Sequence, residues 1–67
     1  MPKFLSSKHI IKVLEDKGFT LKSQKGSHKK YILNNKIVII PYKNKEIPVG
    51  TFNSILRQSG LEKEDFL

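Results

Sequence analysis

The residue with the clearest capacity for chemistry is His28, which follows a glycine and a serine in the stretch Lys25-Gly26-Ser27-His28. Histidine is the side chain best suited to exchange a proton near neutral pH. Gly26 lets a phosphate approach the backbone closely, and Ser27 can hydrogen-bond to it. The matching chemistry is attack of a ribose 2′-hydroxyl on the adjacent phosphodiester. His28 would act as general base, which is typically worth about 10²–10⁴ in rate.

Lysines surround this stretch and could bind phosphates. Their ammonium groups would also stabilise the charge that builds on a pentacoordinate phosphorus. The candidate RNA-binding residues near His28 are Lys22, Lys25, Gly26, Ser27, Lys29 and Lys30. The same residues also fit a surface histidine in a loop that only contacts phosphate, and the local sequence leaves both interpretations open.

His9 has a weaker case, because no glycine turn and fewer lysines surround it, so we expect a solvent-facing helix residue. Both histidines are isolated from carboxylates, so the usual metal-ligand spacings are missing. No constellation of paired acidic residues, as two-metal nucleases need, precedes the acidic residues at 62–65. We therefore expect chemistry without a metal or a cofactor.

Two tyrosines could stack on nucleobases. Tyr31 is expected in the core instead, because it shares a strand face with Leu33. Tyr42 lies in a basic loop after Pro41, and both interpretations stay open for it. Further core residues are predicted at Phe19, Phe52 and Ile55.

The charge distribution favours a polyanionic partner. The 67 residues include 13 Lys and Arg against 6 Asp and Glu, for a net charge of +7. Residues 17–45 contain eight lysines and no acidic residue. Neutralising phosphates releases counterions, so such a segment is typical of a nucleic-acid-binding surface. The alternative is a lysine-rich surface that only keeps the protein soluble.

Composition excludes several classes of protein. Without cysteine there can be no disulfide, thiolate zinc site or cysteine nucleophile, which fits a reducing cytoplasm. The N-terminus is too polar for a signal peptide, and the aliphatic run at 37–40 is too short for a membrane span. The length allows a single domain over residues 1–67, which buries about 60% of its unfolded surface. We expect a cytoplasmic domain that acts on a large substrate across an open surface.

Two amphipathic helices and three strands are predicted to position these residues. The first helix covers about 7–17 and ends at Gly18, and the second covers about 49–58 and ends at Gly60. Strands are predicted at 19–24, where burial should alternate, at 28–33 and at 36–40, which Pro41 closes. The turn Asn34-Asn35 should have positive φ at both residues. Residues 62–67 should form a short acidic turn or helical stub docked through Phe66.

The resulting order is α-β-β-β-α, in the α+β class. A three-stranded antiparallel sheet of this kind would have one face covered by the two helices and the other in water. This is the layout of the double-stranded-RNA-binding domain, although layout alone does not assign a function.

Two longer motifs resemble the HicA family of toxins from toxin-antitoxin systems. They are Lys25-Gly26-Ser27-His28-x-x-Tyr31, before a hydrophobic strand ending at Pro41, and Lys45-Glu46-Ile47-Pro48-x-Gly50-Thr51-Phe52-x-Ser54-Ile55-Leu56-x-Gln58-x-Gly60-Leu61. The resemblance spans nearly the whole chain. It implies a double-stranded-RNA-binding-domain-like fold and an mRNA interferase, which is an endoribonuclease that blocks translation. It also implies that His28 is catalytic and that a HicB antitoxin neutralises the toxin.

The chain departs from this family at one position. Many members carry a second histidine in the loop after the proline, where this chain has Lys43. Proton transfer by this loop is therefore not part of what the resemblance implies, but Lys43 could still hold a phosphate.

Two other functions stay open. A non-catalytic double-stranded-RNA-binding module usually places lysines at the start of its last helix, whereas the stretch 49–58 carries only Arg57. A protein-interaction subunit would use the basic surface to steer an acidic partner. The second function is compatible with a ribonuclease whose antitoxin covers the same face.

Overall fold

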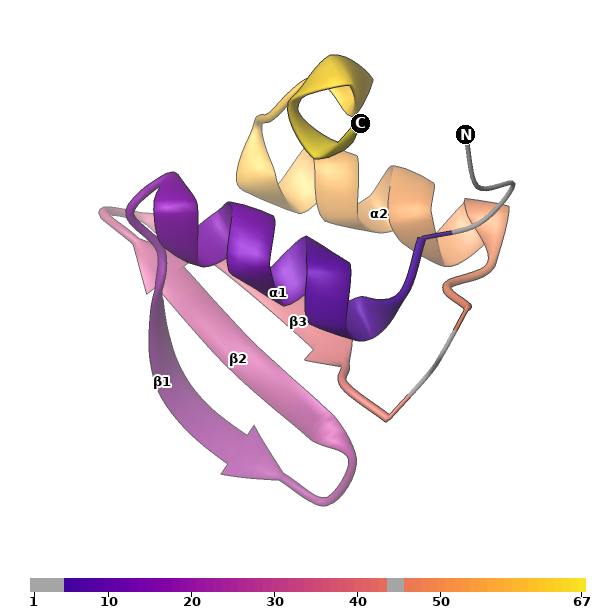
Figure 1. Cartoon of the computed structure of the whole chain (residues 1–67). Helices are drawn as coiled ribbons and strands as arrows, with labels where there is room; N and C mark the ends of the chain where they lie inside the picture. Colours follow the sequence, from indigo (N-terminus) through magenta and orange to yellow (C-terminus); the bar gives the residue numbers. More distant parts are fainter. Residues whose placement is uncertain (1–4, 44–45) are drawn as a thin grey trace.

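A computed structural model describes residues 5–43 and 46–67. Its elements are α1 (Ser7–Asp16), β1 (Thr20–Lys25), β2 (His28–Leu33), β3 (Lys36–Pro41), α2 (Val49–Ser59) and the 3-10 helix η1 (Lys63–Phe66). The strands form one antiparallel sheet in the order β1-β2-β3, and both α-helices lie on one face of it (Figure 1). The predicted α-β-β-β-α order and fold class are confirmed.

Both helices begin where their sequences predict, and each ends within one residue of its predicted end. The side chain of Ser6 caps α1 by accepting a hydrogen bond from the His9 N–H at 3.1 Å, and Gly18, with φ 103°, turns the chain toward the sheet. Gly60, with φ 72°, ends α2 in the left-handed region. Within the described ranges, no helix has the length and apolar character needed to cross a membrane.

Strand β1 differs from its prediction. Its register with β2 shifts between Leu21 and Ser23, which makes Lys22 the extra residue of a β-bulge. All six residues of β1 are exposed, and Phe19, which is buried, precedes the strand. The predicted half-buried alternation over 19–24 is therefore wrong, because β1 is an edge strand with a bulge.

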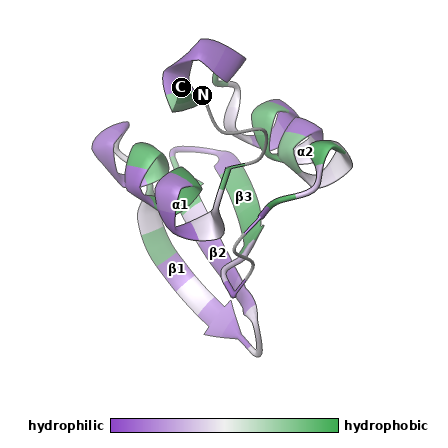
Figure 2. Cartoon of the chain, turned by 45° about the vertical axis from the view of Figure 1, so that its right-hand side comes forward, coloured by the Kyte–Doolittle hydropathy of each residue, from purple (hydrophilic) through white to green (hydrophobic). Residues whose placement is uncertain are grey.

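Each of the two hairpin turns has one residue with positive φ. Asn34 has φ 56°, but Asn35 does not have a positive φ, so the expectation for both asparagines is wrong. In the β1–β2 turn, Gly26 has φ 60°. This hairpin projects beyond the helices in both ribbon views (Figures 1 and 2).

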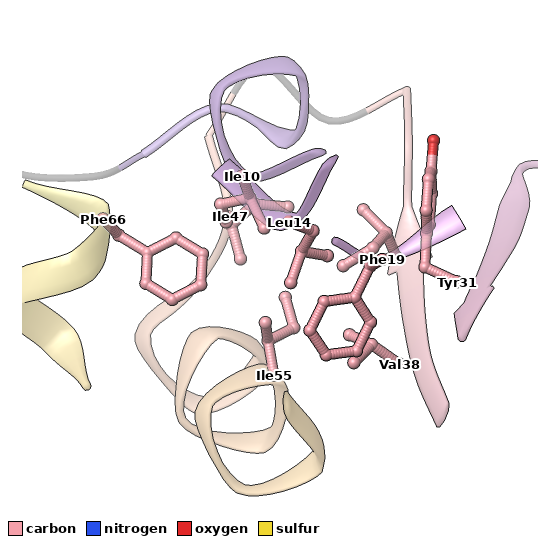
Figure 3. Packing of buried hydrophobic residues seen from close by; sticks show 9 residues of the cluster. Ile10, Leu14, Phe19, Tyr31, Val38, Ile47, Ile55 and Phe66 are labelled. Carbon is pink, nitrogen blue, oxygen red and sulfur yellow. The ribbon is translucent and has the colours of Figure 1, made fainter. Parts of the chain in front are cut away.

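The core lies between the sheet and the two helices, and η1 closes its far end. Figure 3 shows it running from Phe66 of η1 past side chains of α1 and α2 to Tyr31 and Val38 of the sheet. Tyr31 is only 1% exposed, which confirms it as a core residue. The buried hydrophobic residues are Ile10, Leu14, Phe19, Tyr31, Val38, Ile40, Ile47, Ile55 and Phe66.

Candidate functional site

His28 faces the side of the sheet opposite the helices. It is the first residue of β2, and it pairs with Lys25 of β1 and Pro41 of β3. Successive residues of a strand point to opposite faces, and Tyr31, three residues on, is buried under the helices. The His28 side chain is exposed, so a substrate lying on the sheet can reach it.

His28 lines an open hollow on this face. Its volume is about 240 Å³, below the roughly 300–1,000 Å³ typical of sites that enclose a small molecule. The hollow is lined by Ser23, Lys25, His28, Lys29, Lys30 and Ile39. The hollow is thus smaller than a typical site that encloses a small molecule, and it lies open on the surface.

The turn before His28 leaves room for close approach. A Cβ added to Gly26 would meet no atom within 4 Å, so the space around this glycine is open. The left-handed φ of 60° nevertheless favours glycine there. Ser27 is half-buried, and its carbonyl accepts a hydrogen bond from the Tyr42 N–H at 3.0 Å. The turn is therefore open to solvent at Gly26 and is held by the hydrogen bond from Tyr42 to Ser27.

The predicted phosphate-binding lysines are not equivalent. Lys25 and Lys30 both line the hollow with His28, and Lys30 shares the alternation of His28 along β2. Lys29 borders the hollow, but its Nζ lies 4.7 Å from the centroid of the Tyr42 ring. The ammonium group of Lys29 therefore makes a cation–π contact.

The other two predicted lysines lie at the margin. Lys22 occupies the bulge next to Ser23, and Lys43 follows Tyr42 in the turn after β3. Both side chains are exposed, and neither lines the hollow. These two lysines could extend a basic surface around the hollow, but they do not lie beside the His28 side chain.

Tyr42 connects the hairpin to the helical layer, a role that sequence reasoning missed. Its N–H donates to Ser27, its hydroxyl accepts from Gln24 Nε2 at 3.0 Å, and its ring lies under Lys29. On the other side, the Ser7 hydroxyl donates to the Tyr42 carbonyl at 2.6 Å. Tyr42 therefore fixes the turn that carries His28 relative to α1.

His9 lies in the helical layer, away from His28. It is exposed as predicted, but it also has a partner, since its Nε2 lies 2.6 Å from the carbonyl oxygen of Phe66. A carbonyl only accepts, so Nε2 carries the proton of this hydrogen bond. His9 thus joins α1 to η1 and is not part of the site.

Two groups outside the site have shifted pKa values. Burial, with a smaller contribution from Glu15, raises the pKa of Tyr31. The hydrogen bond from the Glu62 N–H lowers the pKa of Asp65, with help from Lys17. Among residues 5–43 and 46–67, no group of three or more His, Cys, Asp or Glu side chains could hold a metal ion.

Comparison with known proteins gives one family. The profile described as "HicA toxin of bacterial toxin-antitoxin" matches residues 7–61. The matched range begins with α1 and includes His28, the residues that line the hollow and Tyr42. It ends before η1. No curated protein matches the chain.

Proposed function

Because the chain belongs to the HicA family of toxins, the toxins of bacterial toxin-antitoxin systems, we propose that it is an endoribonuclease that cleaves mRNA. In this proposal His28 is the general base, and no metal ion takes part. The observation that carries it is the position of His28, which lies exposed on the open face of the sheet in a hollow it shares with Lys25 and Lys30.

The proposed reaction uses the ribose of the RNA itself. His28 removes the proton of a 2′-hydroxyl, and that oxygen attacks the adjacent phosphorus. The 5′-oxygen of the next nucleotide leaves and takes a proton from water, which the open face admits. The products are a 2′,3′-cyclic phosphate and a 5′-hydroxyl. Lys25 and Lys30 stabilise the extra negative charge on the phosphorus oxygens in the transition state.

The distribution of cations supports cleavage over simple duplex binding. A duplex-binding module of this fold would present lysines at the start of α2. Here α2 begins Val49-Gly50-Thr51-Phe52, and the lysines lie instead on the hairpin and on β2, beside His28. The remaining candidates, Lys22, Lys29 and Lys43 with Gly26 and Ser27, would extend the RNA path around this centre.

A protein partner belongs to the same proposal. HicA toxins pair with HicB-type antitoxins. We expect a HicB-type antitoxin to neutralise this chain by covering the basic face, which would attract an acidic surface electrostatically. An mRNA substrate also implies action in the cytoplasm.

The test compares His28→Ala with His9→Gln, which alters the other histidine but keeps a donor for the Phe66 carbonyl. We expect His28→Ala to lower the cleavage rate of a labelled RNA by about 10²–10⁴. Its circular dichroism spectrum and RNA affinity should stay nearly unchanged, and His9→Gln should cleave normally. In bacteria, induced wild type should stop growth and degrade mRNA, whereas His28→Ala should do neither.

Two results would contradict this proposal. One is equal cleavage by a clean preparation of His28→Ala. The other is cleavage of DNA of the same sequence, because DNA lacks the attacking 2′-hydroxyl. Tight duplex binding without any cleavage product would favour the non-catalytic module instead.

A further inference from the structure

The open face of the sheet is apolar along β3. The register places Ile32 opposite Ile37, and Lys30 opposite Ile39, on the face away from the helices. Ile37 is 51% exposed and Ile39 is 37% exposed. Ile32 is half-buried, and none of the described helices lies on this face of the sheet (Figures 1 and 2). We refer to Ile32, Ile37 and Ile39 as the isoleucine strip.

The strip is continuous with the proposed cleavage site. Ile39 lines the same hollow as His28, and it pairs directly with Lys30, whose side chain is on the same face. Figure 2 shows the contrast, with β3 hydrophobic and the β1–β2 hairpin mostly hydrophilic. A ligand that crosses from the hairpin to β3 would therefore meet cations first and aliphatic side chains next.

A side chain of α2 occupies the outer edge of β3 next to the isoleucine strip. The N–H of Ile39 donates to Gln58 Oε1 of α2 at 3.1 Å. A protein strand that extended the sheet at this edge would have to displace Gln58. A ligand that lies on the face, rather than along the edge, leaves this hydrogen bond intact.

We propose that the isoleucine strip binds an unpaired nucleobase next to the scissile phosphate, so that the substrate is single-stranded RNA at the cleavage site. An RNA strand supplies both chemistries that this face offers, because its phosphates suit Lys25 and Lys30 and its base has an apolar flat surface. Unpaired bases are commonly bound between apolar or aromatic side chains. In a duplex both surfaces of a base are already stacked, so a paired base could not lie on the strip. This inference rests on the proposed ribonuclease function and names its substrate.

The experiment measures binding of the full chain in a His28→Ala background, which keeps the RNA intact. Its probes are a fluorescent single-stranded RNA and the same strand with abasic riboses, compared by anisotropy. The test variant is Ile37→Thr/Ile39→Thr, which keeps β-branched residues in the strand. The matched control is Leu21→Thr, an exposed aliphatic residue whose partner Tyr31 places it on the opposite face.

We expect the parent protein and Leu21→Thr to bind the base-bearing strand about tenfold more tightly than the abasic strand, as burial of one base surface would give. In the double variant this preference should fall to about twofold or less. The proposal would be overturned if the double variant kept the full preference for base-bearing RNA, or if the parent protein showed no such preference.

Failure of the strip is distinguishable from failure of the proposed function. If the protein with His28 intact cleaves RNA, but the preference for base-bearing RNA is the same with and without Ile37 and Ile39, only the proposal about the isoleucine strip is wrong. If no RNA is bound at all, both proposals fall. If the strip behaves as expected but His28→Ala still cleaves, the catalytic assignment alone is wrong.

Discussion

At the scale of single residues, the accessibility of His28 depends on its place in the alternation of β2. Tyr31 is buried under the helices, so His28, an odd number of positions away, faces the open side. A slip of one residue in the pairing would turn the imidazole toward the helices. The turn at Gly26 and the hydrogen bond from the Tyr42 N–H to Ser27 fix the end of the strand where His28 lies.

The first prediction concerns Tyr42 as a positioning residue. Tyr42→Ala removes the ring under Lys29 and the acceptor of the Gln24 hydrogen bond. These exposed contacts contribute about 1 kcal/mol each, so the protein should stay folded and lose about 1–2 kcal/mol of unfolding free energy. Because the hairpin would then keep only its backbone hydrogen bond to residue 42 and become more mobile, we expect a several-fold lower single-turnover cleavage rate with RNA affinity nearly unchanged.

Tyr42→Phe separates the two contacts, since it keeps the ring and loses only the hydroxyl. Its cleavage rate should lie between those of wild type and Tyr42→Ala. Amide hydrogen exchange at Ser27 and His28 should rise in the same order. A cleavage loss without faster exchange at these amides would show that Tyr42 contacts the RNA instead of positioning the hairpin.

At the scale of elements, the sequence predicts best where one apolar pattern decides the outcome. Apolar side chains at helical spacing and a left-handed glycine define the ends of α1 and α2, and both helices lie where predicted. The edge strand β1 has no such pattern, because all its residues are exposed and the bulge at Lys22 breaks its period. The alternating pattern of residues 19–24 predicted that the helices would cover one face of this strand. In the structure they do not, because all residues of β1 are exposed.

The candidate site was predictable in part, for a similar reason. The short-range signal of a glycine turn before His28 indicates an exposed histidine near lysines, and the structure places Lys25 and Lys30 beside it. The contacts of Tyr42 join segments that are far apart in the sequence, such as Ser7 with the turn after β3. No local pattern contains that information.

The 3-10 helix η1 completes the core although it lies outside the matched family range. Phe66 is fully buried. Its ring packs edge-on against the Phe52 ring, with 5.3 Å between the two ring centroids. Asp65 accepts a hydrogen bond from the Glu62 N–H at 2.8 Å, and its Oδ1 lies 3.3 Å from Nζ of Lys17, the residue that follows α1. Helix η1 is thus attached to α1 on the side away from the sheet.

The second prediction follows from the lowered pKa of Asp65. A carboxyl with a lower pKa in the folded state stabilises the fold fully above its ordinary pKa of about 3.9, and this stability is lost as the pH falls through the lower folded value. Asp65→Asn should therefore be less stable than wild type at pH 5–7. The two urea midpoints should converge as the pH falls below about 4.

Glu64→Gln is the control for this effect. It removes one negative charge from η1 without touching the Glu62 N–H or Lys17. If Glu64→Gln reproduces the full pH dependence of Asp65→Asn, net charge rather than the Asp65 contacts explains it.

At the scale of the whole molecule, the charges are separated by the fold. The lysines near His28 lie on the hairpin and β2, whereas Glu62, Glu64 and Asp65 lie at η1, beyond the helices from the sheet (Figure 1). With a net charge of +7, such a separation attracts a polyanion and orients it toward the open face. The RNA should therefore meet the sheet before it meets the helical layer.

The last prediction tests this orientation through the salt dependence of binding. For single strands, log K falls with log salt concentration by about 0.7 for each phosphate that a cation neutralises. In a His28→Ala background, Lys25→Gln and Lys30→Gln should each lower this slope by about 0.7. Lys63→Gln removes the same charge from η1, on the far side of the molecule, and should leave the slope unchanged. Equal losses in all three variants would mean that only total charge matters, and a loss confined to Lys63 would place the RNA on the helical side.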